Sequence, residues 1–221
     1  MAGETMKTLK EQTDAKIEAG RKGNPEFMQG VDDVIKQAKN FQQGAEALII
    51  GQLAPDFKLP NPQGELTALN DLLTNGPVVV TFYRGSWCPY CNLQLRALQA
   101  RLADIKALGA ELVAISPQVP DDSLTEDEIS NMDFIVLSDQ NANVAAKFGV
   151  AWEVPEFLLE HMRVDRGLDL ESINNGNTNI LPIPATFIID KNAKVVWRFV
   201  DVDYRTRSEP EEIIQALQQL V

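Results

Sequence analysis

The chain places its only two cysteines at the end of the run Phe82-Tyr83-Arg84-Gly85-Ser86-Trp87-Cys88-Pro89-Tyr90-Cys91. The apolar residues 78–82 precede this run as a strand would, and a long helical pattern follows it. A Cys-x-x-Cys pair at a strand-to-helix junction places its first sulfur at the helix N-terminus. Free backbone N–H groups and the helix dipole stabilise a thiolate there. We therefore expect a reactive dithiol at this junction.

Strand and helix patterns alternate on both sides of the cysteines. Residues 51–64 predict a short strand and turn, which we interpret as a hairpin. The elements then expected are strand 78–83, helix 89–108, strand 110–116, helix 124–132, strand 134–137, helix 141–148, strands 186–190 and 195–200 joined by a loop at 191–194, and a closing helix at 209–220. This alternation is typical of parallel βαβ units, so the sequence predicts an α/β fold.

Two helices are predicted ahead of this body, at residues 4–19 and 25–41. Asn24 is suited to cap the second helix, and Pro25 to occupy its first position. Their apolar face must cover either the body of the domain or a second subunit. We therefore divide the chain into an N-terminal helical extension, residues 1–50, and one domain, residues 51–221.

A stretch rich in turn residues lies at 150–181. It predicts one short helix near 156–162 and otherwise a long loop. Long loops of this kind often serve as lids or as walls of a binding site. A surface insertion without such a role is the alternative.

The composition narrows the classes of function. The chain has 221 residues, of which 44% are hydrophobic, enough for one full core. Asp and Glu number 32 against 20 Lys and Arg, a formal net charge of −12 that would repel a phosphate backbone. The N-terminus lacks the apolar core of a signal peptide, and no segment is apolar enough to span a membrane. No nucleic acid or membrane partner is expected.

The two cysteines also bear on location and on metal binding. They stand too close together to staple distant segments, which fits a reducing compartment where a disulfide would be transient and catalytic. We expect a cytoplasmic protein, with the periplasm as the alternative. A structural zinc site needs four ligands, and beyond the cysteines the chain offers a single histidine, His161. No metal or cofactor is therefore expected.

Three segments resemble the thioredoxin superfamily, and within it the alkyl hydroperoxide reductase and thiol-specific antioxidant, or peroxiredoxin-like, branch. The segments are Gly51-Gln52-Leu53-Ala54-Pro55-Asp56-Phe57 with Leu59-Pro60, Val80 to Cys91, and Ile183-Pro184-Ala185-Thr186-Phe187-Ile188-Ile189-Asp190. The resemblance covers residues 51–221. It implies a thioredoxin-like central mixed sheet flanked by helices.

The resemblance is incomplete at the cysteines. Peroxiredoxins carry a Thr or Ser three residues before the peroxide-reacting Cys and a Pro seven before it, where this chain has Gly85 and Thr81. Ser86 or Thr81 would have to supply the missing hydroxyl. The family's late active-site Arg appears as Pro184, which resembles the cis-proline of thioredoxins. The Cys-Pro-Tyr-Cys centre itself resembles that of glutaredoxins.

Roles at the dithiol follow from position. Cys88 is expected to be the exposed, helix-capping nucleophile, and Cys91, one turn further and more buried, the resolving thiol. Pro89 fits the first helical position, where its missing N–H is not needed. Arg84 is the first candidate for a cation that stabilises the thiolate, and Arg96 the second.

Other residues are expected to shape the substrate site. Trp87 and Tyr90 flank the sulfurs and would form walls, or would be packing residues only. A cis Ile183–Pro184 peptide, which the resemblance implies, would turn the Ile183 backbone toward a bound chain. His161 has no sequence feature that links it to the sulfurs, and we assign it no role.

The resemblance implies an antioxidant thiol peroxidase that reduces hydrogen peroxide or organic hydroperoxides. Thioredoxin, glutaredoxin or glutathione would recycle its disulfide. A protein disulfide reductase with little peroxidase activity is the alternative, and Gly85 and Pro184 favour it. A redox-sensing binding protein that acts through its N-terminal helices is a third hypothesis. Residues 1–50 fit either a homodimer arm or an intramolecular cap.

Overall fold

The computed structural model describes residues 7–119 and 132–220. Its elements are α1 Leu9–Gly23, α2 Pro25–Asn40, β1 Lys58–Pro60, β2 Leu66–Ala68, α3 Leu69–Leu73, β3 Val78–Phe82, α4 Pro89–Ala100, α5 Leu102–Ala107, β4 Glu111–Ser116, β5 Ile135–Ser138, α7 Asn143–Lys147, β6 Ala151–Glu153, α8 Glu156–Glu160, the π-helix η1 His161–Asp165, α9 Leu170–Ile173, β7 Ile180–Pro182, β8 Ala185–Ile189, β9 Val195–Val200 and α10 Pro210–Gln218. The helix predicted near 124–132 falls mostly outside the described residues.

A five-stranded mixed sheet forms the body, in the order β5-β4-β3-β8-β9. The central strand β3 pairs in parallel with β4 and antiparallel with β8, and all five of its residues are buried. A strand with both faces covered needs a continuous apolar run, which residues 78–82 supply. The predicted α/β fold with a central mixed sheet is confirmed, as are the β1–β2 and β8–β9 hairpins.

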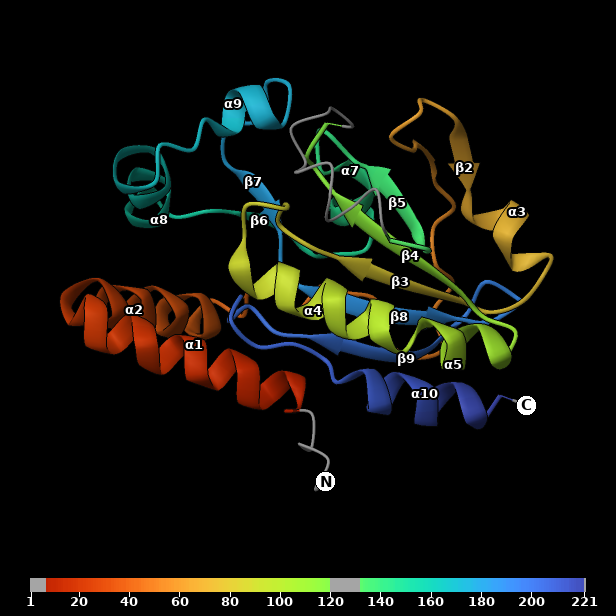
Figure 1. Ribbon diagram of the computed structural model, residues 1–221. Coiled ribbons are helices and arrows are strands. Elements are labelled where there is room, and N and C mark those ends of the chain that lie inside the picture. The colour runs from red at the N-terminus through yellow and green to blue at the C-terminus, as the bar shows by residue number, and fades with distance from the viewer. Residues whose placement is uncertain (1–6, 120–131, 221) are drawn as a thin grey trace.

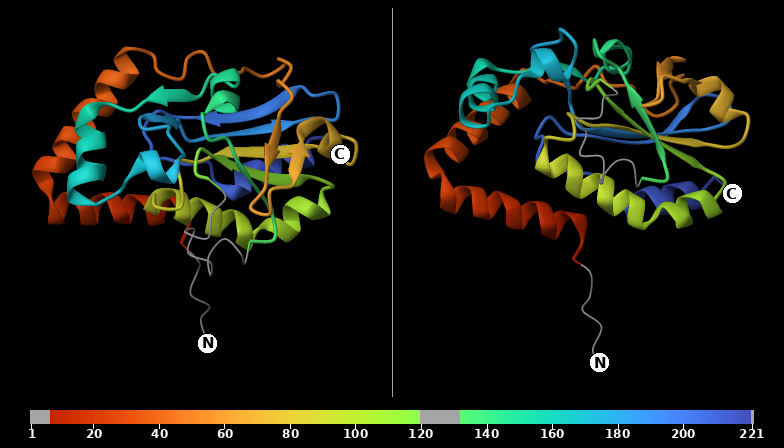
Figure 2. Two further views of the ribbon diagram at one scale, coloured as in Figure 1. Left: turned by 90° about the horizontal axis from the view of Figure 1, so that it is seen from above. Right: turned by 45° about the horizontal axis from the view of Figure 1, so that its top comes forward.

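Helices cover both faces of this sheet. Figures 1 and 2 show α4, α5 and α10 along one face and α7 on the other. Between sheet and helices, Phe82, Phe148 and Phe187 pack with ring centroids 5.1 to 6.2 Å apart. This aromatic cluster anchors β3, whose C-terminal end leads directly to the two cysteines.

The helix predicted at 89–108 is broken into α4 and α5 at Arg101. The Arg101 backbone N–H bonds to the carbonyl of Leu98, three residues back, which tightens the chain at this point. Its guanidinium pairs with Asp104 at 2.6 Å and with Glu211, on α10, at 2.9 Å. The apolar periodicity of the sequence continues through this break, so the break itself was not predicted.

The insertion at 150–181 is more ordered than expected. Its predicted helix is present as α8 followed by η1, but β6 and β7 form a small antiparallel sheet and α9 lies between η1 and β7. The expectation of an otherwise irregular loop is therefore wrong. Strands of three residues are too short for an alternating pattern to reveal them.

Helices α1 and α2, which we call the N-terminal arm, form a helical hairpin that packs on its own chain (Figure 2). As predicted, the Asn24 side chain caps α2 by accepting from the Phe27 N–H, and Pro25 begins the helix. The Phe27 ring stacks on Phe157 at 5.6 Å and on His161 at 3.7 Å between centroids. These contacts belong to an intramolecular cap. The division at residue 50 stays a prediction.

The helices of residues 7–119 and 132–220 are short or amphipathic. Within these ranges, none combines the length and the apolar character that a bilayer crossing requires.

Candidate active site

The dithiol lies where β3 leads into α4. Cys88 is the N-cap of α4, with extended backbone angles, and Pro89 occupies the first helical position as predicted. Both thiols are reduced, and both are buried, Cys88 with 1% of its surface exposed and Cys91 with none. The expectation of an exposed Cys88 is wrong. Helix α1 packs against α4, and Arg207, from the loop before α10, reaches the Cys91 sulfur.

Arg84 is a buried cation next to the dithiol. Its guanidinium carbon lies 4.2 Å from the centre of the Tyr204 ring and 5.1 Å from that of Trp87. Its Nη2 lies 3.9 Å from the Met162 sulfur, and its Nε has no hydrogen-bond partner. Within residues 7–119 and 132–220, no carboxylate pairs with it. Aromatic faces can stabilise a buried cation without neutralising it, so its charge remains available to a thiolate.

A second buried guanidinium, that of Arg207, was missed by the sequence analysis. Its Nη2 donates to the Cys91 sulfur at 3.1 Å, and its Nη1 donates to the backbone carbonyls of Tyr204 and Thr206. Arg207 has no local motif and lies 116 residues from Cys91 in sequence. Arg96, the predicted second cation, is exposed on α4 instead.

The two thiols ionise very differently. Burial opposes ionisation of Cys88, but the Cys91 thiol, the charges of Arg84 and Arg207 and the Cys91 backbone N–H together hold its pKa well below the ordinary value. This N–H faces the sulfur without closing a hydrogen bond of normal geometry. Burial and the neighbouring Cys88 raise the pKa of Cys91 well above the ordinary value, against the charge of Arg207. The reduced site therefore carries one thiolate, at Cys88.

Gly85 explains why no hydroxyl stands three residues before Cys88. Its φ of +149° lies in a region that residues with a side chain rarely adopt, and a Cβ there would collide with the Trp87 indole. The neighbouring Ser86 donates to Gln118 Oε1 from its backbone N–H at 2.9 Å and from its hydroxyl at 3.1 Å. The Ser86 hydroxyl is thus used to hold the loop.

Thr81, the other candidate for a peroxide-binding hydroxyl, belongs to a buried polar network behind the site. Its hydroxyl lies 3.0 Å from that of Thr186, and Gln94 Nε2 donates to both hydroxyls, at 3.3 and 3.4 Å. Ser208 donates to Thr186 at 3.2 Å. This network ties β3, α4 and β8 to the start of α10.

The aromatic residues beside the cysteines are placed as walls. Tyr90 is buried, its ring stands edge-on to Tyr204 at 6.1 Å, and burial raises its pKa to about 12. Trp87 is half-buried, and its carbonyl accepts a hydrogen bond from Arg166 at 2.8 Å. Both rings therefore stand against a buried arginine or its supporting tyrosine.

The Ile183–Pro184 peptide is trans, so the expected cis bond is wrong. The Ile183 N–H donates to the Val150 carbonyl at 2.7 Å, next to the β6–β7 pairing. Because this N–H is satisfied within the chain, it is not available to a bound peptide. The insertion supplies the partner strand that a substrate chain was expected to supply.

The comparisons with known proteins agree with this architecture. Residues 50–198 match the model of the AhpC/TSA family. The chain belongs to that family. Peroxiredoxin Bcp of Escherichia coli strain K12 is 26% identical over 169 residues, covering 76% of this AhpC/TSA chain and 95% of the relative. Thiol-disulfide oxidoreductase ResA of Bacillus cereus is 26% identical over 179 residues, covering 81% and 84%.

Solved structures show the same fold. Peroxidoxin BcpB from Mycobacterium tuberculosis aligns with a TM-score of 0.59 and 23% identity over 78% of the AhpC/TSA chain and 97% of that chain. A peroxiredoxin-like protein from Aquifex aeolicus aligns with a TM-score of 0.60 and 18% identity, covering 79% and 89%. The predicted thioredoxin-like, peroxiredoxin-like fold is confirmed.

Other polar clusters in the AhpC/TSA protein do not reach the sulfurs. His161 Nδ1 lies 2.6 Å from Asp165 Oδ2 while its ring stacks on Phe27, which fits the absence of an assigned role. Across the described ranges, 7–119 and 132–220, no three His, Cys, Asp or Glu side chains gather as metal ligands would. The thiols themselves are the reactive groups of the site.

Proposed function

We propose that this AhpC/TSA protein is a thiol peroxidase that reduces hydrogen peroxide or organic hydroperoxides through a Cys88–Cys91 dithiol/disulfide cycle. One observation carries the proposal: two buried arginines without carboxylate partners among the described residues flank a buried Cys-x-x-Cys pair of which only Cys88 ionises. An unneutralised cation in a buried site stabilises a thiolate, and the thiolate is the reactive form of cysteine.

The proposed cycle balances with two electrons. The Cys88 thiolate attacks the terminal peroxide oxygen, the O–O bond breaks, and the alcohol or water leaves with a proton, giving a sulfenic acid at Cys88. Cys91 then attacks the Cys88 sulfur, the S–O bond breaks and water leaves, closing the Cys88–Cys91 disulfide. An external dithiol returns two electrons by thiol–disulfide exchange.

Burial of the dithiol favours a small oxidant. Hydrogen peroxide is little larger than water and can enter through small fluctuations, whereas a protein disulfide must bring two sulfurs and their backbone to Cys88. With 1% of Cys88 exposed, the described conformation admits the first more readily. Trp87 and Tyr90 would restrict the approach of bulky substrates.

A thiol–disulfide oxidoreductase is the second candidate. Two observations favour it: Gly85 stands where a peroxidase hydroxyl is expected, and the chain resembles the Bacillus cereus protein named thiol-disulfide oxidoreductase ResA. A redox sensor acting through the N-terminal arm is the third. Such a sensor would stop after one equivalent of oxidant, whereas either enzyme turns over with a reductant.

Three further parts of the proposal concern the setting of the reaction. Thioredoxin, glutaredoxin or glutathione would reduce the disulfide, and the absence of any cysteine beyond the pair fits the reducing cytoplasm. We also expect a homodimer, although the N-terminal arm packs on its own chain. Analytical ultracentrifugation tests the dimer directly.

Stopped-flow oxidation of the reduced protein tests the proposal. Hydrogen peroxide, an alkyl hydroperoxide and a small disulfide are compared by their second-order rate constants, and a peroxidase reacts fastest with one of the peroxides. Cys88→Ser abolishes every reaction, whereas Cys91→Ser still reacts once and accumulates a trappable sulfenic acid. A disulfide as the fastest oxidant would favour the second candidate, and full activity of Cys88→Ser would reject the roles of the two thiols.

A further inference from the structure

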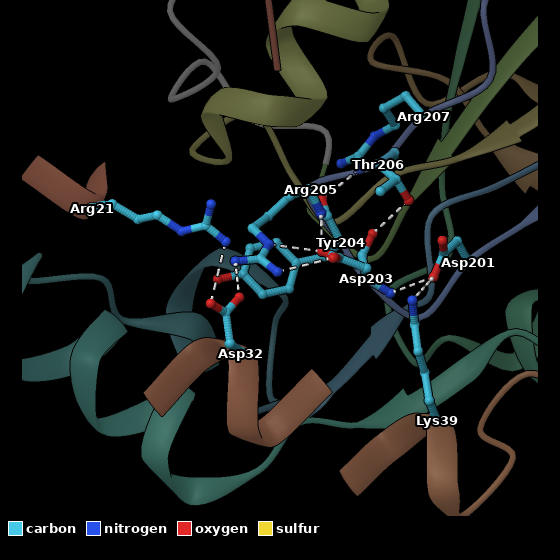
Figure 3. Close-up of polar contacts among 9 residues, drawn as sticks. All are labelled: Arg21, Asp32, Lys39, Asp201, Asp203, Tyr204, Arg205, Thr206 and Arg207. Atoms are coloured by element: carbon cyan, nitrogen blue, oxygen red, sulfur yellow. Dashed lines mark hydrogen bonds and ion pairs between the residues drawn. The ribbon is translucent and has the colours of Figure 1, made fainter. Parts of the chain in front are cut away.

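The N-terminal arm is bound by ion pairs to the loop that precedes α10. We call residues Asp201–Ser208 the arginine loop. Figure 3 shows Asp32, on α2, facing Arg205 of this loop, with 2.7 Å between Oδ1 and Nη1. Arg21, on α1, also reaches Asp32 at 3.3 Å, and Lys39 lies 3.5 Å from Asp201. The arm thus holds both ends of one short segment.

The arginine loop is rigid between these ion pairs. Arg205 is 95% buried and binds Asp203 with two parallel hydrogen bonds, at 2.8 and 2.9 Å. Thr206 donates its hydroxyl to the Asp203 carbonyl at 2.9 Å. A bidentate arginine–carboxylate pair fixes orientation as well as distance. Displacement of Arg205 would therefore move the rest of the loop.

Two residues of this loop act on the dithiol. Arg207, two residues after Arg205, donates to the Cys91 sulfur at 3.1 Å. Tyr204, one residue before Arg205, supports the Arg84 guanidinium with its ring. The position of Arg205 therefore determines where both groups stand relative to the sulfurs.

Four groups act on the Cys91 thiol. Burial and the Cys88 thiolate oppose its ionisation, whereas the Arg207 guanidinium and the Arg84 backbone N–H favour it. The phenol of Tyr83 lies close enough for Cys91 to affect its ionisation. Once oxidation consumes the Cys88 thiolate, the largest opposing charge is gone and the arginine remains.

We propose that the N-terminal arm, through the Asp32–Arg205 ion pair, positions Arg207 against Cys91 and thereby makes Cys91 reactive once Cys88 has been oxidised. This inference rests on the proposed dithiol cycle. Arg207 touches a reacting sulfur, and Asp32 acts through it as a positioning residue.

The step that depends on Arg207 is the closure of the disulfide. The Cys91 sulfur supplies the electron pair for the new S–S bond, and the S–O bond of the Cys88 sulfenic acid breaks. Hydroxide leaves and takes up the Cys91 proton as water. Arg207 stabilises the negative charge that develops on Cys91 before this proton transfer is complete.

The test isolates Cys91 in a Cys88→Ser background, where no neighbouring thiolate can form. Cys91 is titrated by the ultraviolet absorbance of its thiolate, a readout that needs no access to the buried sulfur. The same background then carries Arg207→Gln, Arg207→Lys, Asp32→Asn or the matched control Asp14→Asn. Asp14 is also an arm carboxylate, but it pairs with Lys10 on the same helix.

We expect Arg207→Gln to raise the Cys91 pKa by about one unit or more, a tenfold change in the ionisation constant. Asp32→Asn raises it in the same direction because Arg207 loses its position, and Asp14→Asn leaves it unchanged. Should Arg207→Gln fail to fold, Arg207→Lys, which keeps the charge but loses the planar fork, is expected to raise the pKa by a smaller amount. If Asp32→Asn titrates like Asp14→Asn, the proposal is overturned.

A second readout uses the protein with both cysteines. After one equivalent of hydrogen peroxide, the lifetime of the Cys88 sulfenic acid is measured by trapping it at timed intervals. Asp32→Asn should lengthen this lifetime at least about threefold, and Asp14→Asn should not; equal lifetimes would contradict the proposal. The titration uses no oxidant, so it keeps its meaning even if neither peroxide nor disulfide proves to be a substrate.

Discussion

The guanidinium carbon of Arg84 lies 4.2 Å from the centre of the Tyr204 ring. This contact joins the loop before α4, which carries the dithiol, to the loop before α10, which carries Arg207. The arginine thereby keeps its charge within a buried site without a carboxylate to neutralise it among the described residues. Cys88 is then the group on which that charge acts, so the contact links the packing of two distant loops to thiol chemistry.

Replacement of Arg84 by Gln should raise the pKa of Cys88, because a charge that favours the thiolate is lost while the burial that opposes it remains. A rise of about one unit would lower the second-order rate constant with peroxide by up to about tenfold at neutral pH. Thiolate absorbance against pH gives the pKa, and stopped-flow gives the rate. Arg96→Gln is the control, since Arg96 is exposed on α4. Equal titration of the two variants would contradict the role of Arg84.

Replacement of Tyr204 separates its ring from its hydroxyl. Tyr204→Phe keeps the aromatic face under Arg84, and Tyr204→Leu removes it, with an expected loss of about 0.5–2 kcal/mol in the cation–π contact. The Leu variant should therefore raise the pKa of Cys88, whereas the Phe variant should leave it near that of the unsubstituted protein. The same titration measures both. A Phe variant that behaves like the Leu variant would show that the hydroxyl, and not the ring, matters.

The contact between arm and loop should weaken in acid. Burial works against ionisation of Asp32, but Arg205 and Arg21 outweigh it and hold the pKa of this carboxylate below its ordinary 3.8. A carboxylate with a lowered folded-state pKa contributes stability above its unfolded-state pKa and loses it as the pH falls through the folded-state pKa. We expect this contribution to be complete above pH 3.8 and to disappear below it.

Urea unfolding of the protein and of Asp32→Asn over a pH series measures this contribution. The difference between their free energies of unfolding cancels the other carboxylates, which titrate in both proteins. That difference should shrink as the pH falls. A difference that stays constant with pH would mean that the Asp32 carboxylate does not titrate with the fold.

Restoring a hydroxyl before Cys88 by Gly85→Ser should harm the protein. The φ of +149° at Gly85 is unfavourable for any side chain, and the new Cβ would meet Trp87. Backbone strain of this kind costs about 1–3 kcal/mol, so the melting temperature should fall and the peroxide rate should not rise. Gly23→Ser is the control, because nothing lies within 4 Å of a Cβ there. A faster peroxide reaction of Gly85→Ser would mean that the loop can adapt to the missing hydroxyl.

Local signals in the sequence determined the order of elements and the chemistry at their junction. The apolar run 78–82 could only be a strand covered on both faces, and Cys88 followed by Pro89 could only begin a helix well. Asn24 and Pro25 began α2 for the same reason. All of these depend on residues within a few positions of one another, which is why a single sequence was enough to predict them.

Only the tertiary structure decided how the dithiol is surrounded. Burial of Cys88 overturned the expected exposure, and the Val150 carbonyl took the Ile183 N–H expected to face a substrate. Arg207 reaches Cys91 across 116 positions of the chain, and no periodicity or spacing connects such distant residues. The charge and burial that select one sulfur over the other arise from the packing of separate segments. The sequence thus places the two thiols, whereas long-range contacts determine which of them ionises.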